Sequence, residues 1–169
     1  VRAGFQKDNL RLSLDKENLN DKDIVYFGDL DEIWTPQDMQ DDKVYNLKQL
    51  NYSYWLNYRS SEVCIGTIVG KWGTVKTNTV NYWRANHDNI LENGGWHFTK
   101  MGGVEQIIKK LEAYDHANEV IPFLSQYEGY GIKERMEGGY DYLGRAKDYW
   151  GNPYVFTIDD SQLPKYILE

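Results

Sequence analysis

The sequence predicts an α/β fold in a single domain, and two observations carry that prediction. Apolar runs typical of buried strands are interspersed along the chain with segments whose apolar residues follow helical spacing. The chain has 169 residues, 41% of them hydrophobic and 27% charged, which is enough to build one hydrophobic core. We therefore expect residues 1–169 to form one domain, with a mixed sheet flanked by helices.

The first third of the chain predicts a helix, a strand and the start of a second helix. Over residues 5–19, three apolar residues lie roughly on one side of a helix: Phe5, Leu12 and Leu19. A charged turn then leads into the apolar run Ile24–Phe27, which predicts a short buried strand. A cap, a first-position proline and a first-turn acid predict a further helix start: Thr35, Pro36 and Asp38.

The remaining elements follow from period-2 and period-3.6 patterns. Strands are predicted over 51–58, 62–70, 95–99 and 154–158. The clearest helix spans 102–116, where four apolar residues follow the i, i+3, i+4, i+7 spacing: Val104, Ile107, Ile108 and Leu111. Residues 118–139 predict another helix, kinked or restarted at Pro122.

Composition excludes several classes of function. The formal net charge of −7 argues against a nucleic-acid partner, since such proteins usually carry a basic patch. The single cysteine, Cys64, cannot form an internal disulfide and is expected to pack in the core. No apolar stretch approaches the roughly 20 residues that span a bilayer, so we expect no membrane span and take the cytoplasm as the default location. The aromatic content of 15% suits both core packing and stacking on flat ligands.

Three acids follow the strand Ile24–Phe27 directly, and they are the strongest candidate site. Asp29, Asp31 and Glu32 repel one another and lose water there, which costs free energy unless a cation or proton compensates. An Asp-x-Asp pair at a strand end suits a Mg²⁺ or Mn²⁺ ion that also binds a diphosphate. A solvated acidic loop is the alternative interpretation of the same residues.

The three histidines are His87, His97 and His116, and their own surroundings assign none of them a role. His97 lies between Trp96 and Phe98, where a buried histidine bonded within the core is more common than a ligand. His116 follows the clearest helix and can neutralise its C-terminal carbonyl groups, and His87 stands in a polar loop.

Three motifs in order carry a resemblance to a known family. They are "DIVYFGDLDEI", "GGWHFTKMGGVEQIIKKLEAYDH" and "LPKYI". Together they resemble glycosyltransferase family 17, which contains the bisecting β-1,4-mannosyl-glycoprotein β-1,4-N-acetylglucosaminyltransferase of N-glycans and many bacterial and viral relatives. The likeness runs from about Phe5 to Ile167. Gly28 stands where the family usually has Ser, and Trp34 stands where it usually has Pro. The family's early segment is not present, so we expect a domain shortened at its N-terminus.

The resemblance implies a GT-A-like fold and transfer of a sugar, GlcNAc by default, from a UDP-linked donor to a glycan hydroxyl with inversion. It implies a divalent metal, Mn²⁺ or Mg²⁺, held by Asp31, Asp29 and His97. Glu32 and Asp31 are then the candidate catalytic residues. Further candidates for contact with the donor are Asp29, Trp96, Lys110 and His116, whereas Arg84 fits a surface salt bridge better than a phosphate fork. Outside the Golgi enzymes, whose membrane anchor is absent here, the expected location is the cytoplasm.

Two other functions stay open at this point. A haloacid dehalogenase-like phosphatase would use Asp29 as nucleophile and Asp31 as acid/base, with Ile158–Ser161 supplying later acids. A non-catalytic carbohydrate-binding module, or an inactive transferase remnant, would use the aromatic side chains to bind a glycan without metal or nucleotide.

Overall fold

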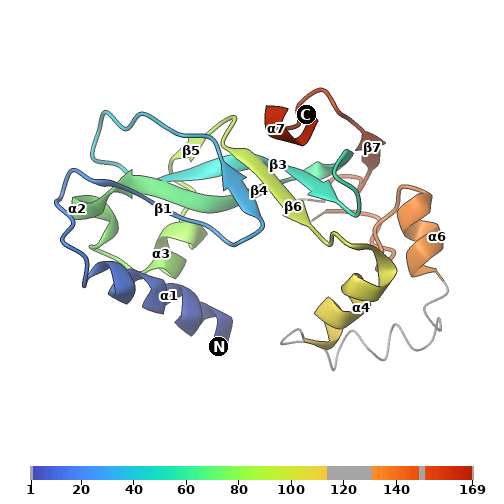
Figure 1. The fold of residues 1–169 in the computed structure, drawn as a ribbon, viewed down its shortest axis with the longest axis horizontal. Coiled ribbons are helices and arrows are strands. Elements are labelled where there is room, and N and C mark those ends of the chain that lie inside the picture. Colours follow the sequence, from blue (N-terminus) through green and yellow to red (C-terminus); the bar gives the residue numbers. More distant parts are fainter. Residues whose placement is uncertain (1, 114–130, 149–150, 169) are drawn as a thin grey trace. The chain divides into compact units, whose positions relative to one another are not determined.

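The computed structural model describes residues 2–113, 131–148 and 151–168 and shows a mixed α/β fold (Figure 1). Its helices are α1 Arg2–Leu14, α2 Trp72–Val75, α3 Val80–Ala85, α4 Gly103–Glu112, α6 Ile132–Glu137 and α7 Lys165–Leu168. Its strands are β1 Ile24–Phe27, β2 Glu32–Trp34, β3 Tyr45–Ser53, β4 Tyr58–Lys71, β5 Ile90–Leu91, β6 Gly95–Thr99 and β7 Phe156–Ile158. The predicted α/β class is thereby confirmed.

The strands belong to one seven-stranded sheet with the order β1-β4-β3-β6-β2. Strand β5 pairs with β3 in parallel, whereas β7 pairs with β4, β1 with β4 and β2 with β6 in the antiparallel sense. Strand β1 therefore lies at one edge of this order and β2 at the other.

The chain divides into two compact units, and the long strands β3 and β4 contribute to both. The first unit comprises Val1–Gln49 and Cys64–His97, and the second comprises Leu50–Val63 and Phe98–Glu169. In the first unit α1 contacts α3 and α2 contacts β1 (Figure 1). Its core includes Val25 and Phe27 of β1, which are the inward-facing residues of an alternating strand.

The second unit has a core rich in aromatic residues. Helix α4 buries Ile107 and Leu111 in this core, with Val104 and Ile108 packed against it, so the face predicted from the sequence is confirmed. The other buried members are Tyr54, Ile132, Met136, Tyr142, Tyr154 and Phe156.

Most predicted strands are confirmed, with shifted limits. Strand β1 has the predicted bounds, β6 covers the predicted Gly95–Thr99, and β4 contains all of 62–70. The strand expected over 51–58 is instead the end of β3, a turn at Tyr54–Asn57 and the start of β4. The C-terminal strand is shorter than expected, Phe156–Ile158.

Two helix predictions need correction. Helix α1 exists, but Phe5 is 73% exposed and Leu12 48%, so they do not form the expected buried face. No helix starts at Thr35, because its backbone N–H donates to Gly94 O (3.1 Å) and the next segment is held by Gln37 N–H donating to Tyr26 Oη (2.7 Å). Of the helix predicted over 118–139, α6 is described and residues 118–130 lie outside the described part of the chain.

Candidate functional site

The three acids lie in a tight turn between β1 and β2 in the first unit. The Glu32 backbone N–H donates to Asp29 O (3.0 Å), which closes the turn and starts β2 at Glu32. Strand β2 then pairs with β6, and this register sets Glu32 opposite His97. The fold therefore brings the acidic turn and the Gly-Trp-His segment to one place.

Glu32 is almost fully buried, at 4% exposure, and both of its carboxylate oxygens are bonded. Thr67 Oγ1 donates to Oε2 (2.6 Å), and Arg84 Nη2 donates to Oε1 (2.9 Å). A Cβ at Gly66 would overlap the carboxylate, and one at Gly28 would lie 2.6 Å from Thr67 Oγ1. The absence of a side chain at Gly28 thus leaves room for the Thr67–Glu32 hydrogen bond.

Asp29 shares its cation with Glu32. The same Arg84 Nη2 donates to Asp29 Oδ2 (3.0 Å), and Lys7 Nζ of α1 donates to that oxygen as well (2.9 Å). Burial acts to lower the pKa of Arg84, but its hydrogen bond to Glu32 and the charges of Glu32 and Asp29 outweigh burial and raise it. Arg84 is only 15% exposed, so it is a buried bridge between two acids and not the surface salt bridge expected from the sequence.

Asp31 pairs with the histidine of β6. Its Oδ2 lies 3.5 Å from His97 Nε2. Burial acts to lower the pKa of His97, but the hydrogen bond to Asp31 and the nearby Cys64 sulfur outweigh burial and raise the pKa to about 10. Cys64 is half-buried, and its neighbour is this imidazole, so the expectation of a plain core cysteine is corrected.

The charges of this site balance. Three acids, Asp29, Asp31 and Glu32, are paired with three basic side chains, Lys7, Arg84 and His97. The protein's own cations therefore compensate the repulsion between carboxylates at the strand end. Any ion that binds here competes with a cation that is already present.

The spacing of Asp31 and His97 is compatible with two ligands of one divalent metal. Two ligands bonded at about 2.1 Å and at right angles lie about 3 Å apart, close to the observed 3.5 Å. Carboxylate oxygen and imidazole nitrogen both suit Mn²⁺-type ions. Among the described residues, no set of three or more His, Cys, Asp or Glu side chains could hold a metal. A metal at this pair would complete its coordination with water and ligand oxygens.

The other residues predicted for the site are less closely associated with it. Trp96 is half-buried in β6 and lies opposite Ile33 of β2. Lys110 belongs to the second unit, where its exposed side chain lies 3.5 Å from Thr99 Oγ1. His116 lies outside the described residues.

Sequence reasoning missed Lys7 and Thr67 altogether. Lys7 is in α1 and Thr67 is in β4, so both are far from the acids in the sequence. A polar residue such as Thr67 within the apolar run of β4 was the one available signal, because buried hydroxyl groups need partners.

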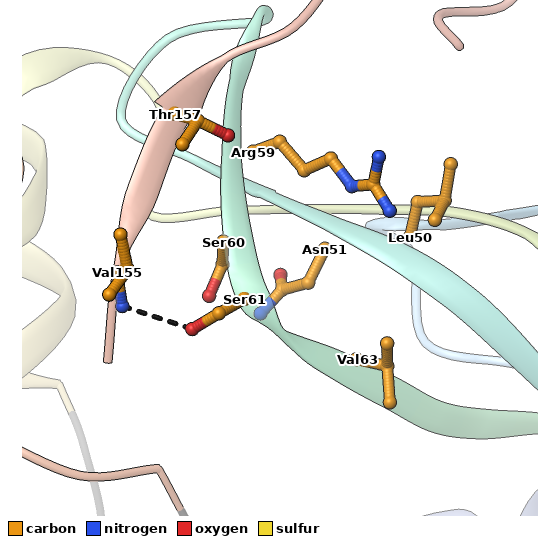
Figure 2. A pocket seen from close by; sticks show the side chains of 8 residues that line it. All are labelled: Leu50, Asn51, Arg59, Ser60, Ser61, Val63, Val155 and Thr157. Atoms are coloured by element: carbon orange, nitrogen blue, oxygen red, sulfur yellow. Dashed lines mark hydrogen bonds between the residues drawn. The ribbon is translucent and has the colours of Figure 1, made fainter. Parts of the chain in front are cut away.

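A cavity of about 380 Å³ adjoins the acids. It is lined by Gly28, Asp29, Leu30, Glu32, Ile33 and Trp34. A second cavity, of about 190 Å³, belongs to the other unit and is bordered by residues of β3, β4 and the segment before and within β7 (Figure 2). Two polar side chains that line this second cavity are already engaged: Arg59 Nη1 donates to Asp159 Oδ2 (2.8 Å), and Val155 N–H donates to Ser61 Oγ (3.0 Å). The first cavity is the better candidate site.

No protein-family model, curated protein or solved structure matches the chain. Within the residues that the structure describes, no helix is both long and apolar enough to cross a bilayer.

Proposed function

We propose that this chain is a metal-dependent inverting glycosyltransferase with a GT-A-like fold. It would move a sugar, GlcNAc by default, from a UDP-linked donor to a hydroxyl group of a glycan acceptor. The observation that carries the proposal is the pairing of Asp31 with His97, 3.5 Å apart, where an Asp-x-Asp turn meets the Gly-Trp-His strand. This pairing supports the proposal because its two residues come from the two motifs that resemble glycosyltransferase family 17.

The residues of the site have distinct proposed roles. Asp31 and His97 would hold the metal, which supplies positive charge to the leaving diphosphate when bound. Lys7 and Arg84 lie beside Asp29 and add two further cations for phosphate oxygens. Asp29 is the third candidate metal ligand, but it must first exchange contacts with these cations.

Glu32 suits a positioning role better than proton transfer. Both of its oxygens accept strong hydrogen bonds, and the group is buried, so an acceptor hydroxyl has little access to it. Its contacts hold Arg84 and the turn in place. Asp31 is the other candidate catalytic residue, and its place in the proposal is on the metal.

The test is a series of thermal melts with nucleoside diphosphates and nucleotide sugars, each with and without Mn²⁺. A ligand at 100 times its dissociation constant adds about 2.7 kcal/mol to the free energy of unfolding, which raises the melting temperature by about 5–10 °C. We expect a shift with UDP only when Mn²⁺ is present, and Asp31→Asn removes it. A metal-dependent shift that Asp31→Asn leaves unchanged contradicts the proposal.

A carbohydrate-binding module without catalysis is the second candidate function. The cavity beside the acids includes an exposed tryptophan, Trp34, which suits a carbohydrate-binding module without catalysis. Such a module binds free sugar without nucleotide or metal and shows no UDP-dependent shift. The phosphatase alternative has less support, because Asp159 of the proposed later acids is occupied by Arg59 and Ser161 within the second unit.

A further inference from the structure

We propose that the cavity next to the acidic turn is a binding site for one pyranose ring, with Trp34 as its stacking platform. The cavity measures about 380 Å³, at the small end of the range for ligand sites, which suits a single sugar unit. Trp34 stands where family 17 members usually have proline, so this platform is a property of this chain. That the bound ring belongs to a substrate rests on the proposed transferase function; that the cavity binds a pyranose does not.

The indole ring of Trp34 is held firmly yet remains open to solvent. It stacks on Tyr26 with ring centroids 5.2 Å apart and an interplanar angle of 12°. Tyr26 is itself fixed, since its hydroxyl oxygen accepts a hydrogen bond from the Gln37 N–H. Trp34 nevertheless stays 40% exposed, so a flat apolar surface is presented without the cost of ordering a mobile side chain.

The neighbouring strand leaves the indole uncovered. In the β2–β6 pair, Trp34 lies opposite Gly95, which has no side chain to pack across the ring. Gly95 has a φ of 118°, and a Cβ there would overlap Ile33 O, so a larger residue cannot take its place without strain. Leu30, fully exposed, adds a further apolar surface to the same cavity.

The rest of the lining identifies the class of ligand. Asp29, whose side chain is 42% exposed, supplies the accessible carboxylate of this lining, and an ionised carboxylate only accepts hydrogen bonds. A pyranose has an apolar C–H face for the indole and hydroxyl groups around its rim that donate to carboxylates. A pyrimidine base also stacks, but its carbonyl oxygens would face the Asp29 carboxylate. Asp29 therefore favours the sugar over the base.

The experiment measures sugar binding without metal or nucleotide. Methyl β-D-glucopyranoside and N-acetylglucosamine are titrated into the protein, with saturation-transfer NMR at the ring C–H protons and acrylamide quenching of tryptophan fluorescence as readouts. Sorbitol, which has hydroxyl groups but no ring, and uridine are the comparison ligands. We expect millimolar binding of at least one pyranoside, protection of a tryptophan from acrylamide, and no comparable signal with sorbitol or uridine.

Variants assign the effect to one ring. Trp34→Ala is expected to weaken pyranoside binding by about 10-fold or more, whereas Trp34→Phe, which keeps a flat ring, stays within about 3-fold. The matched control is Trp55→Ala, because Trp55 is equally exposed, at 43%, but does not line the cavity. Thermal melts check that each variant is folded. If Trp34→Ala does not fold, Trp34→Phe still tests the inference.

Each outcome separates this inference from the proposed function. Three results would overturn the inference, even if Mn²⁺-dependent UDP binding is found. The first is unchanged pyranoside binding in Trp34→Ala, and the second is tighter binding of uridine than of the pyranosides. The third is no pyranoside binding at concentrations up to about 50 mM. Trp34-dependent pyranoside binding with no UDP binding supports the inference and counts against the transferase.

Discussion

Each unit of this protein buries a carboxylate next to an arginine, and the two pairs differ in how they are built. In the second unit Asp141, 1% exposed, accepts hydrogen bonds from Arg145 Nη2 (2.7 Å) and Nε (3.0 Å). It also accepts from the backbone N–H groups of Leu143 (3.0 Å) and Arg145 (3.1 Å). These four hydrogen-bond donors all lie within four residues of Asp141, and the pair closes a local turn.

Glu32 in the first unit has partners from distant parts of the chain. Thr67 is 35 residues away and Arg84 is 52 residues away, and Arg84 is shared with a second acid. This pair also borders a cavity, whereas Asp141 lines neither of the two cavities described. Burial of a charge is thus no sign of function by itself. The distant, shared cation beside a cavity distinguishes the candidate site from a structural ion pair.

The largest expected effect comes from removing the shared cation. Arg84→Met leaves Glu32 buried without a counter-charge, which costs about 3–5 kcal/mol of unfolding free energy. Arg145→Met is the matched variant. It should cost less, because Asp141 keeps two backbone donors and Arg145 is 48% exposed. Urea melts of both variants measure the difference, and an equal or larger loss in Arg145→Met would contradict this view of the two pairs.

The substitution Gly28→Ala, which adds one methyl group, tests how closely the residues around Glu32 are packed. Gly28→Ala sets a Cβ 2.6 Å from Thr67 Oγ1 and 3.0 Å from Glu32 Oε2, and overpacking of this kind costs about 1–3 kcal/mol. Gly4→Ala is the comparison variant, because a Cβ there meets only the flexible Asn81 side chain at 3.4 Å and alanine within helix α1 is expected to keep or raise stability. A Gly28→Ala protein as stable as wild type would mean that the turn relaxes easily.

A smaller effect, dependent on pH, is expected in the second unit. Burial lowers the pKa of Lys100 from 10.5 to about 8, although its ammonium group lies 5.0 Å from the Tyr142 ring centre. Because the folded state binds this proton more weakly than the unfolded state, the penalty is fully present below pH 8 and disappears as pH rises to about 10.5. Lys100→Met should therefore raise the free energy of unfolding at pH 7 by up to about 3 kcal/mol, since one pKa unit corresponds to about 1.4 kcal/mol.

The measurement for Lys100 is the difference between variant and wild type in urea melts at pH 7 and pH 10. Lys133→Met is the control, since the Lys133 side chain is 67% exposed. The gain in Lys100→Met should shrink at pH 10, whereas the control shows none at either pH. A gain that is equal at both pH values would exclude titration of Lys100 as its cause.

Much of the fold followed from local patterns. Strand β1, strand β6 and helix α4 were predictable because their apolar spacing is strong and their own residues decide the structure. The segment after Trp34 was not, because the helix signal at Thr35 and Pro36 loses to hydrogen bonds with Gly94 and Tyr26. Helix α3 and strand β2 are short and carry no such pattern.

The candidate site was predictable only in its outline. The sequence indicated the acids and, through the family resemblance, His97. It gave no sign that Lys7 and Arg84 neutralise Asp29, because such pairs depend on tertiary contacts between α1, α3 and the turn. The sequence also offered no account of Gly28 and Trp34, whose surroundings in the structure are the Thr67 hydroxyl and the cavity.

The proposed transferase depends on a divalent metal held by Asp31 and His97, whereas Asp29 and Glu32 are bound to the protein's own cations. The most direct test is calorimetric titration of Mn²⁺, with UDP present, into wild type, Asp31→Asn and the control Asp159→Asn from the second unit. Since the pKa of His97 is raised to about 10, binding must displace its proton, so affinity should rise with pH between 6 and 8 and protons should be released. The account predicts that Asp31→Asn abolishes this binding and that Asp159→Asn leaves it intact. Binding by Asp31→Asn with wild-type affinity would contradict it.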